Sequence, residues 1–299
     1  MPPSGKSLFW QKVTIVERKR MRKLALRDEI LLQIDKAARY IGGEVNAVMK
    51  NKDDVDIRFA MAFPDVYEIG MSNLGMMILY DMFNKRDDVW CERLFSPWTD
   101  LDKIMREEKI PLFTLESQDP VREFDFLGIT LGYEMCYTNV LQLLDLGGIP
   151  LRAAQRTEDD PLVIGGGACA YNPEPLAAFF DLFYIGEGET VYDALFDAYK
   201  ANKAAGGSRE DFLLLAAQIP GIYVPAFYDV TYHEDGTIAS FEPNRAEAPR
   251  VIQKQLIIDM EKGYLSLIHI FIHFHNRVDF SADIAGCFVN TKQYFVTKC

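Results

Sequence analysis

Along the chain, short and mostly apolar runs are separated by stretches with helical spacing, and this alternation predicts an α/β fold. The runs predict buried strands at 56–63, 89–95, 126–131, 162–164 and 182–185. The stretches between them predict helices at 76–85, 101–108, 137–146 and 191–202. Because each strand is followed by a helix, the strands are expected to form one doubly wound parallel sheet.

The pattern changes on both sides of this core. Before it, the spacing of apolar residues from Leu24 to Ile34 predicts a helix. After it, Ser208 to Asp211 form a capping-box-like start for a helix, and 222–241 alternate as an appended β-hairpin with its turn at Glu234 to Gly236. We therefore divide the chain into four parts: an N-terminal helix and entry segment (1–54), the α/β domain (55–205), a helix plus β-hairpin (206–250), and a linker with a tail (251–299).

Two glycine-rich segments follow consecutive predicted strands. Leu162 to Ile164 runs into Gly165-Gly166-Gly167, and 182–185 runs into Gly186-Glu187-Gly188. Asn172 and Pro173 are suited to begin a helix between them. Since the carboxyl ends of parallel strands share one edge of a sheet, both segments are expected to meet there, where open α/β folds bind ligands. Three consecutive glycines cost more backbone entropy than a plain turn requires, which favours a ligand loop over a purely structural one.

A nucleotide-binding interpretation fits these glycines less well. Gly165, Gly167 and Ala170 formally match the dinucleotide fingerprint, and Glu187 lies near its usual acidic position. That fingerprint belongs on the first strand of a fold, before a long helix. Here it follows a later strand, and 172–175 leave room for a helix of only about two turns. We interpret the match as coincidence.

Composition excludes several classes of protein. The 299 residues are 49% hydrophobic and carry a net charge of −12, which suits a globular protein and argues against nucleic acid as a partner. No apolar run approaches the roughly 18 residues that span a bilayer, so no membrane role is expected. Five cysteines without paired spacing predict neither zinc nor disulfides, in keeping with a reducing cytoplasm.

The last part of the chain differs from the rest. Leu265 to Ile270 resembles translated sequencing-adapter sequence, so we expect residues 264–299 not to be native. His269, His273 and His275 would share one face of a strand there, but for that reason we assign them no metal site.

Several phrases of the sequence occur in an order typical of one family. They include FAMAFPDVYEIGMSNLG (59–75), RLFSPWTDLDKIM (93–105) and PLVIGGGACAYNPEPLAAFFDLFYIGEGE (161–189). From about Leu26 to Lys262 the chain resembles the amino-terminal domain of an uncharacterised family of radical S-adenosylmethionine (radical SAM) proteins, which carry a cobalamin-binding-like domain before the radical barrel.

The resemblance implies a flavodoxin-like sheet with strand order 2-1-3-4-5. It also implies a corrinoid signature, Asp-x-His-x-x-Gly, at 65–70, where Tyr67 stands in place of the histidine. A phenol is a poor cobalt ligand compared with imidazole, so any cobalamin would lack a histidine lower ligand. The cofactor-binding residues expected from the resemblance are Asp65, Tyr67, Gly70, Thr130, Gly165, Gly166, Gly167, Glu187 and Gly188.

The sequence lacks the Cys-x3-Cys-x2-Cys motif that radical SAM enzymes use to hold a [4Fe–4S] cluster. We therefore expect no catalytic or metal-binding residues in this chain. The cluster, S-adenosylmethionine and the radical barrel would belong to a missing C-terminal part, the partner in cis, and the substrate is not indicated. Two functions follow from the resemblance: a cobalamin-binding accessory domain, or an empty corrinoid-type fold that docks on the barrel or on a substrate.

Overall fold

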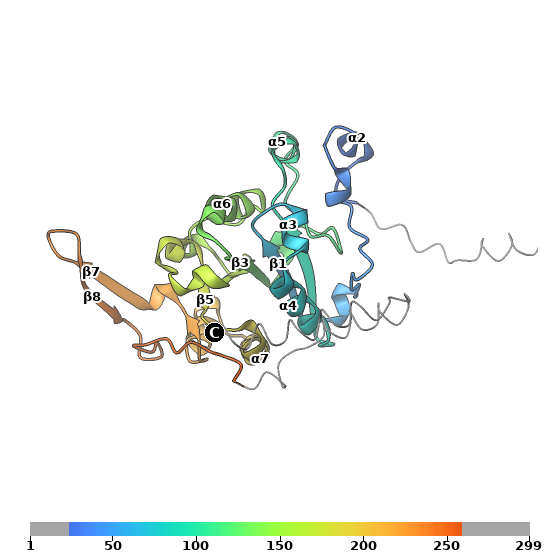
Figure 1. Cartoon of the computed structure of the whole chain (residues 1–299). Helices are drawn as coiled ribbons and strands as arrows, with labels where there is room; N and C mark the ends of the chain where they lie inside the picture. The colour runs from blue at the N-terminus through green and yellow to red at the C-terminus, as the bar shows by residue number, and fades with distance from the viewer. Residues whose placement is uncertain (1–23, 259–299) are drawn as a thin grey trace, which may run out of the picture. The chain divides into compact units, whose positions relative to one another are not determined.

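The computed structural model describes residues 24–258 of the protein. The centre of the fold is a six-stranded sheet (Figure 1). The strand order is β2-β1-β3-β4-β5-β6, and the first five strands of this order are parallel. This confirms the predicted flavodoxin-like order 2-1-3-4-5. The strands are β1 (Ile57–Phe63), β2 (Val89–Phe95), β3 (Phe126–Thr130), β4 (Leu162–Gly166), β5 (Leu182–Tyr184) and β6 (Ile222–Tyr223).

The strands form because their side chains are buried on both faces of the sheet. Every residue of β1 and β2 is buried. Such strands read as nearly continuous apolar runs, which is why the sequence located them well. Along β1, Phe59 and Phe63 face one apolar layer, whereas Ala60 and Ala62 face the other.

Helices cover both faces, as a doubly wound fold requires (Figure 1). One face carries α4 (Leu74–Asn84), α7 (Tyr192–Ala204) and α8 (Arg209–Ala216), and the other carries α5 (Thr99–Glu108) and α6 (Tyr137–Leu146). The side chain of Asn73 caps α4 by accepting from the Met76 amide at 2.9 Å. The predicted capping box of Ser208 and Asp211 is present at α8.

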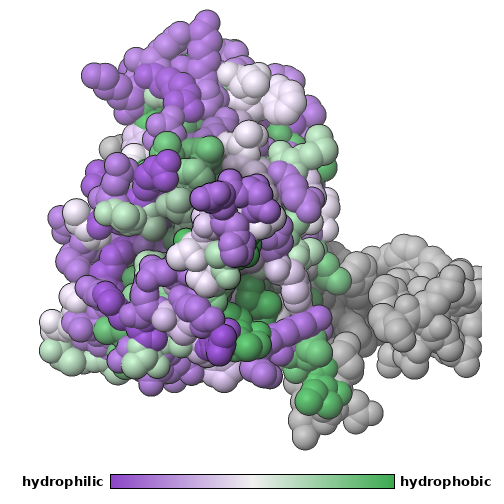
Figure 2. Space-filling view, turned by 90° about the vertical axis from the view of Figure 1, so that its left-hand side faces the viewer, coloured by the Kyte–Doolittle hydropathy of each residue, from purple (hydrophilic) through white to green (hydrophobic). Residues whose placement is uncertain are grey.

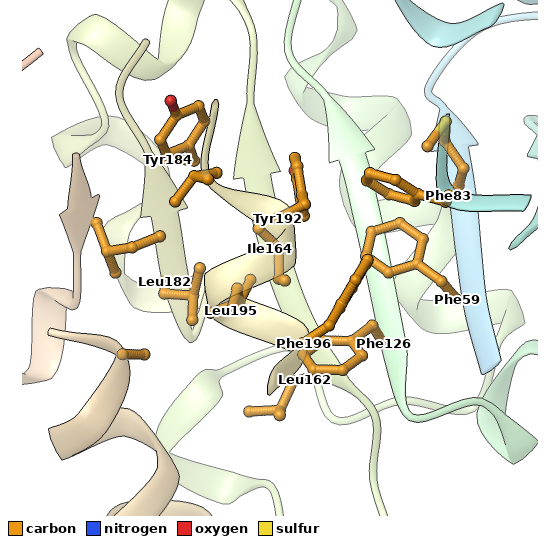
Figure 3. Packing of buried hydrophobic residues seen from close by; sticks show 14 of the residues in the cluster. Phe59, Phe83, Phe126, Leu162, Ile164, Leu182, Tyr184, Tyr192, Leu195 and Phe196 are labelled. Atoms are coloured by element: carbon orange, nitrogen blue, oxygen red, sulfur yellow. The ribbon is translucent and has the colours of Figure 1, made fainter. Parts of the chain in front are cut away.

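Aromatic rings fill the layer between the sheet and α7 (Figure 3). Phe59 on β1 lies 5.0 Å from Phe83 on α4, and Phe83 lies 4.5 Å from Tyr192 on α7, measured between ring centroids. Phe196 packs against the same rings. Edge-to-face contacts of this kind add to the free energy gained from burial alone, so this layer holds α4 and α7 at a fixed distance.

The remaining helices are short. They are α2 (Asp28–Leu31), α3 (Tyr67–Met71) and the 3₁₀ helices η1 (Ala37–Arg39), η2 (Lys52–Asp54), η3 (Val121–Glu123), η4 (Glu134–Cys136), η5 (Ala153–Gln155), η6 (Ala168–Tyr171), η7 (Glu174–Phe179), η8 (Gly188–Thr190) and η9 (Pro225–Phe227).

Two helix predictions were wrong. The predicted helix from Leu24 to Ile34 is only the single turn α2, although Leu26, Ile30 and Ile34 are buried as its apolar stripe required. The helix expected to begin at Asn172 is replaced by the 3₁₀ helix η7, and Asn172 instead lies at the end of η6. Pro173 and Pro175 supply no amide hydrogens there, which disfavours a regular helix.

The β-hairpin is present as β7 (Tyr228–Tyr232) and β8 (Ile238–Pro243), which project from the sheet (Figure 1). The prediction that it begins at Ile222 was wrong, because β6 instead pairs antiparallel with β5 and extends the main sheet. On the face of the molecule shown in Figure 2, the surface is mostly hydrophilic, with apolar residues gathered in its lower part. The predicted non-native tail and the three histidines in it lie outside the described residues.

Candidate functional site

A cavity of about 140 Å³ lies at the carboxyl edge of the sheet, beneath α4 and α7. It is bounded by the ends of β3 and β4 and by the loop that follows β5. In open α/β sheets this edge is where ligands bind. The residues of its wall that matter below are Thr130, Gly166, Gly167, Gly186, Gly188 and Tyr192.

The three consecutive glycines serve three different purposes. Gly165 and Gly166 belong to β4, and a Cβ on Gly165 would fall 2.5 Å from the ring of Phe183, so Gly165 is required for packing. Gly167 has φ +112°, and its added Cβ would fall 2.8 Å from the Leu131 carbonyl oxygen. Only at Gly166 is the space open, since the nearest atom to an added Cβ is the Tyr192 hydroxyl oxygen at 4.0 Å. The backbone of Gly166 therefore lines the cavity, with no side chain between it and a ligand.

Two hydroxyl groups accompany Gly166 at the cavity. Thr130 is paired with Gly166 across β3 and β4, and Tyr192 begins α7. Neither hydroxyl hydrogen-bonds to another group among residues 24–258. Burial raises the pKa of the Tyr192 phenol, so it stays a neutral group that can donate or accept a hydrogen bond. The cavity thus offers an apolar floor with two hydroxyls for a ligand.

The volume of the cavity limits what it can enclose. An apolar protein cavity of about 150 Å³ accepts benzene, whereas whole small-molecule sites span about 300–1,000 Å³. At about 140 Å³, this cavity can hold one planar ring and leave the rest of a larger ligand above the sheet edge.

The loop after β1 holds the predicted Asp65, but in contacts of its own. One carboxylate oxygen of Asp65 accepts from the Val66 amide at 2.7 Å, and the other accepts from the Tyr133 hydroxyl. This hydrogen bond raises the pKa of Tyr133 to about 12. Asp65 therefore ties the loop after β1 to the loop after β3.

Tyr67 and Gly70 face β2 and not the cavity. The Tyr67 hydroxyl donates to Glu44 at 3.3 Å, and its ring meets the edge of Phe95, with centroids 5.5 Å apart. Burial raises the pKa of Tyr67, so the phenol is held protonated. An added Cβ on Gly70 would fall 2.1 Å from the Phe95 ring, so this glycine lets α3 approach β2.

The structure thus brings together four of the nine predicted residues, Thr130, Gly166, Gly167 and Gly188, in the wall of one cavity. Asp65, Tyr67, Gly70, Gly165 and Glu187 are not part of that wall. The carboxylate of Glu187 accepts a hydrogen bond from the Ile257 amide. Sequence reasoning missed Tyr192, whose position in the first turn of α7, directly after the second glycine segment, could have pointed to it.

Exposed apolar side chains surround this edge. They lie in the loops or helix starts that follow β1, β2, β3 and β4, and they are Ile69, Leu74, Trp98, Tyr133, Met135 and Tyr171. Met135 is 89% exposed and Trp98 is 50% exposed. Large apolar groups gathered around one edge indicate a surface that meets another molecule or domain. We call this set the apolar rim.

Two further findings concern the described residues as a whole. Within 24–258, no three histidine, cysteine or acidic side chains gather where they could hold a metal ion. None of the helices in this part of the chain is long and apolar enough to cross a membrane.

Residues 75–225 match the family described as radical SAM proteins, N-terminal. The uncharacterized protein MJ0966 of Methanocaldococcus jannaschii is 25% identical over 131 residues, which are 44% of this chain. That match spans 24% of the relative, so the chain corresponds to about a quarter of its length. Among solved structures, the radical S-adenosylmethionine methyltransferase TsrM of Kitasatospora setae, with tryptophan and a SAM analogue bound, matches 60% of this chain and 29% of its own. Its identity of 14% and TM-score of 0.33 support no functional argument.

Proposed function

Because the chain belongs to the radical SAM proteins, whose N-terminal region it carries, we propose that it is the accessory domain of a radical SAM enzyme and binds a corrinoid. The observation that supports this most is the cavity at the carboxyl edge, where the backbone of Gly166 lines the wall beside the hydroxyls of Thr130 and Tyr192. We propose this cavity, with Gly167 and Gly188, as the cofactor site.

The residues present suit the tail of a corrinoid. The cavity takes one planar ring, and the hydroxyls of Thr130 and Tyr192 offer hydrogen bonds to a nitrogen of that ring. The corrin itself would then lie over the sheet edge, where the apolar rim offers Trp98 and Met135. A bound corrinoid supplies radical chemistry, for which the protein provides binding and orientation.

The domain would hold the cobalt without a histidine. Tyr67 occupies the histidine position of the signature, and its hydroxyl donates to Glu44. Among the described residues the sole histidine is His233, which lies in the turn of the hairpin. Cobalamin should therefore bind with its base removed from cobalt and with no imidazole in its place.

The [4Fe–4S] cluster and S-adenosylmethionine belong, in this proposal, to the radical barrel that follows in cis. The described cysteines, Cys91, Cys136 and Cys169, are free and come from three separate elements. They lack the close spacing that a cluster needs. Free thiols also fit a reducing cytoplasm, where we place the protein.

The apolar rim favours a second function, an interaction domain whose corrinoid-type fold is empty. In that case the rim would dock directly on the barrel or on a substrate, and the small cavity would stay closed by the partner. The two proposals differ in one measurable property, which is affinity for a corrinoid.

Titration of the purified chain with hydroxocobalamin, followed by absorbance and calorimetry, separates them. We expect saturable binding by the wild type and by Gly132→Ala, a control at an exposed loop glycine with no atom near its added Cβ. Gly166→Val should bind at least about tenfold more weakly, because its side chain fills the cavity while the strand tolerates it. No binding at high micromolar ligand would leave only the interaction domain. Equal binding by Gly166→Val would contradict the proposed location.

A further inference from the structure

The last described segment of the chain, residues 252–258, is bound to the loop that follows β5, and we call this segment the connector. The Gln255 amide donates to the Ile185 carbonyl at 3.1 Å, and the Glu187 amide donates to the Gln255 carbonyl at 3.0 Å. These bonds make a parallel bridge between Gly186 and Gln255. The Ile257 amide adds a hydrogen bond to the Glu187 carboxylate. The connector is therefore held by backbone and side chain together.

Two glycines make room for this contact. Gly186 has φ +145°, and an added Cβ would fall 2.4 Å from the Gln255 carbonyl oxygen. Gly221 has φ +86°, and its added Cβ would fall 2.9 Å from Cγ of Gln255. Glycine is the residue that adopts such backbone angles at little cost. Two separate parts of the sheet edge thus accommodate the same connector residue, as expected of a built docking site.

The loop that holds the connector also forms a wall of the cavity. Gly186 and Gly188 line the cavity, and Glu187 between them holds the connector. The hydroxyl of Tyr184, on β5, holds this loop by donating a hydrogen bond to the Glu187 carbonyl at 2.8 Å. A shift of this loop must therefore change both the shape of the cavity and the hydrogen bonds that hold the connector.

We propose that residues 185–188 couple the cavity to the connector, so that a docked connector keeps the cavity wall in place and a filled cavity favours docking. Glu187 is then a positioning residue for the connector and not a ligand of the cofactor. Coupling of this kind is reciprocal, since each event must favour the other by the same factor. Only the identity of the ligand rests on the proposed function.

The test measures amide exchange and glycine amide signals by NMR on the isotope-labelled 299-residue chain. Glu187→Ala removes the acceptor for Ile257, whereas Glu187→Gln keeps an acceptor oxygen. Gly186→Ala displaces Gln255 directly, and Gly206→Ala is its control, because Gly206 also has positive φ but an added Cβ meets no atom within 4 Å.

We expect the Gln255 and Ile257 amides to exchange roughly 3- to 10-fold faster in Glu187→Ala, with a smaller change in Glu187→Gln. Gly186→Ala should give at least about a tenfold increase and Gly206→Ala none. The signals of Gly166 and Gly167 should shift in Glu187→Ala although its side chain is outside the cavity wall.

Unchanged exchange in Glu187→Ala and Gly186→Ala would overturn the docking of the connector. Faster exchange with unshifted signals of Gly166 and Gly167 would overturn its coupling to the cavity. A wild-type chain that binds no hydroxocobalamin would contradict the proposed function alone, because both amide measurements are made without ligand.

Discussion

Two adjacent glycines of β4 should respond in opposite directions to the same substitution. In Gly165→Ala the new Cβ falls 2.5 Å and 2.7 Å from two ring carbons of Phe183, which is fully buried and cannot swing into solvent. Overpacking of a core costs about 1–3 kcal/mol. Gly166→Ala meets no atom closer than 4.0 Å and should stabilise the protein by about 0.4–1 kcal/mol, because alanine restricts the unfolded chain.

Urea denaturation of the two variants, followed by far-UV circular dichroism, measures this contrast. The free energies of unfolding should differ by about 1.5–4 kcal/mol, the sum of the two effects. The contrast matters for function because it separates a glycine kept for packing from one kept for a ligand. Equal destabilisation of both variants would refute the assignment of Gly166 to the cavity.

Three further predictions concern the stability of the domain. Arg93→Met should lower the free energy of unfolding by about 3–5 kcal/mol in denaturant titrations, because Nε of the fully buried Arg93 lies 2.7 Å from Oε1 of the equally buried Glu116 and the substitution removes the cation that balances this carboxylate; a loss below about 1 kcal/mol would contradict this. A hydrogen bond from Arg86 holds the pKa of Asp88 below its usual value, so the stability it contributes is present above about pH 4 and is lost as the pH falls further. Asp88→Asn should accordingly flatten the loss of stability between about pH 4 and pH 2 in acid titrations, and an unchanged slope would count against the ion pair. Ser208→Ala should lower stability by about 1 kcal/mol in thermal unfolding, through loss of the α8 capping box, whereas an unchanged melting temperature would show that the cap is dispensable.

The sheet could be predicted from the sequence because burial on both faces leaves a direct signal. All seven residues of β1 and of β2 are buried, so both appear as mostly apolar runs, interrupted only by Arg58 in β1 and by Glu92 and Arg93 in β2. The match of residues 75–225 likewise confirms the family resemblance. β6 was assigned to the hairpin because residues 222–241 alternate like the strands of a hairpin, and its place beside β5 depends on tertiary contact alone.

The candidate site was predictable only in its position. Glycine segments after consecutive strands located the carboxyl edge correctly. Neighbouring residues on a strand point to opposite faces, but the sequence could not show that Phe183 packs on the face of Gly165 and that the cavity lies on the face of Gly166, because both depend on tertiary packing. Nor could it show that Glu187 reaches Ile257, since that contact joins residues 70 apart in the chain.

The most direct test of the central claim compares amide spectra of the labelled chain without and with saturating hydroxocobalamin. The account predicts that the largest shifts occur at Thr130, Gly166, Gly167 and Gly188, around the cavity at the carboxyl edge. Shifts confined to other parts of the chain, or none at all, would contradict a corrinoid site in this cavity.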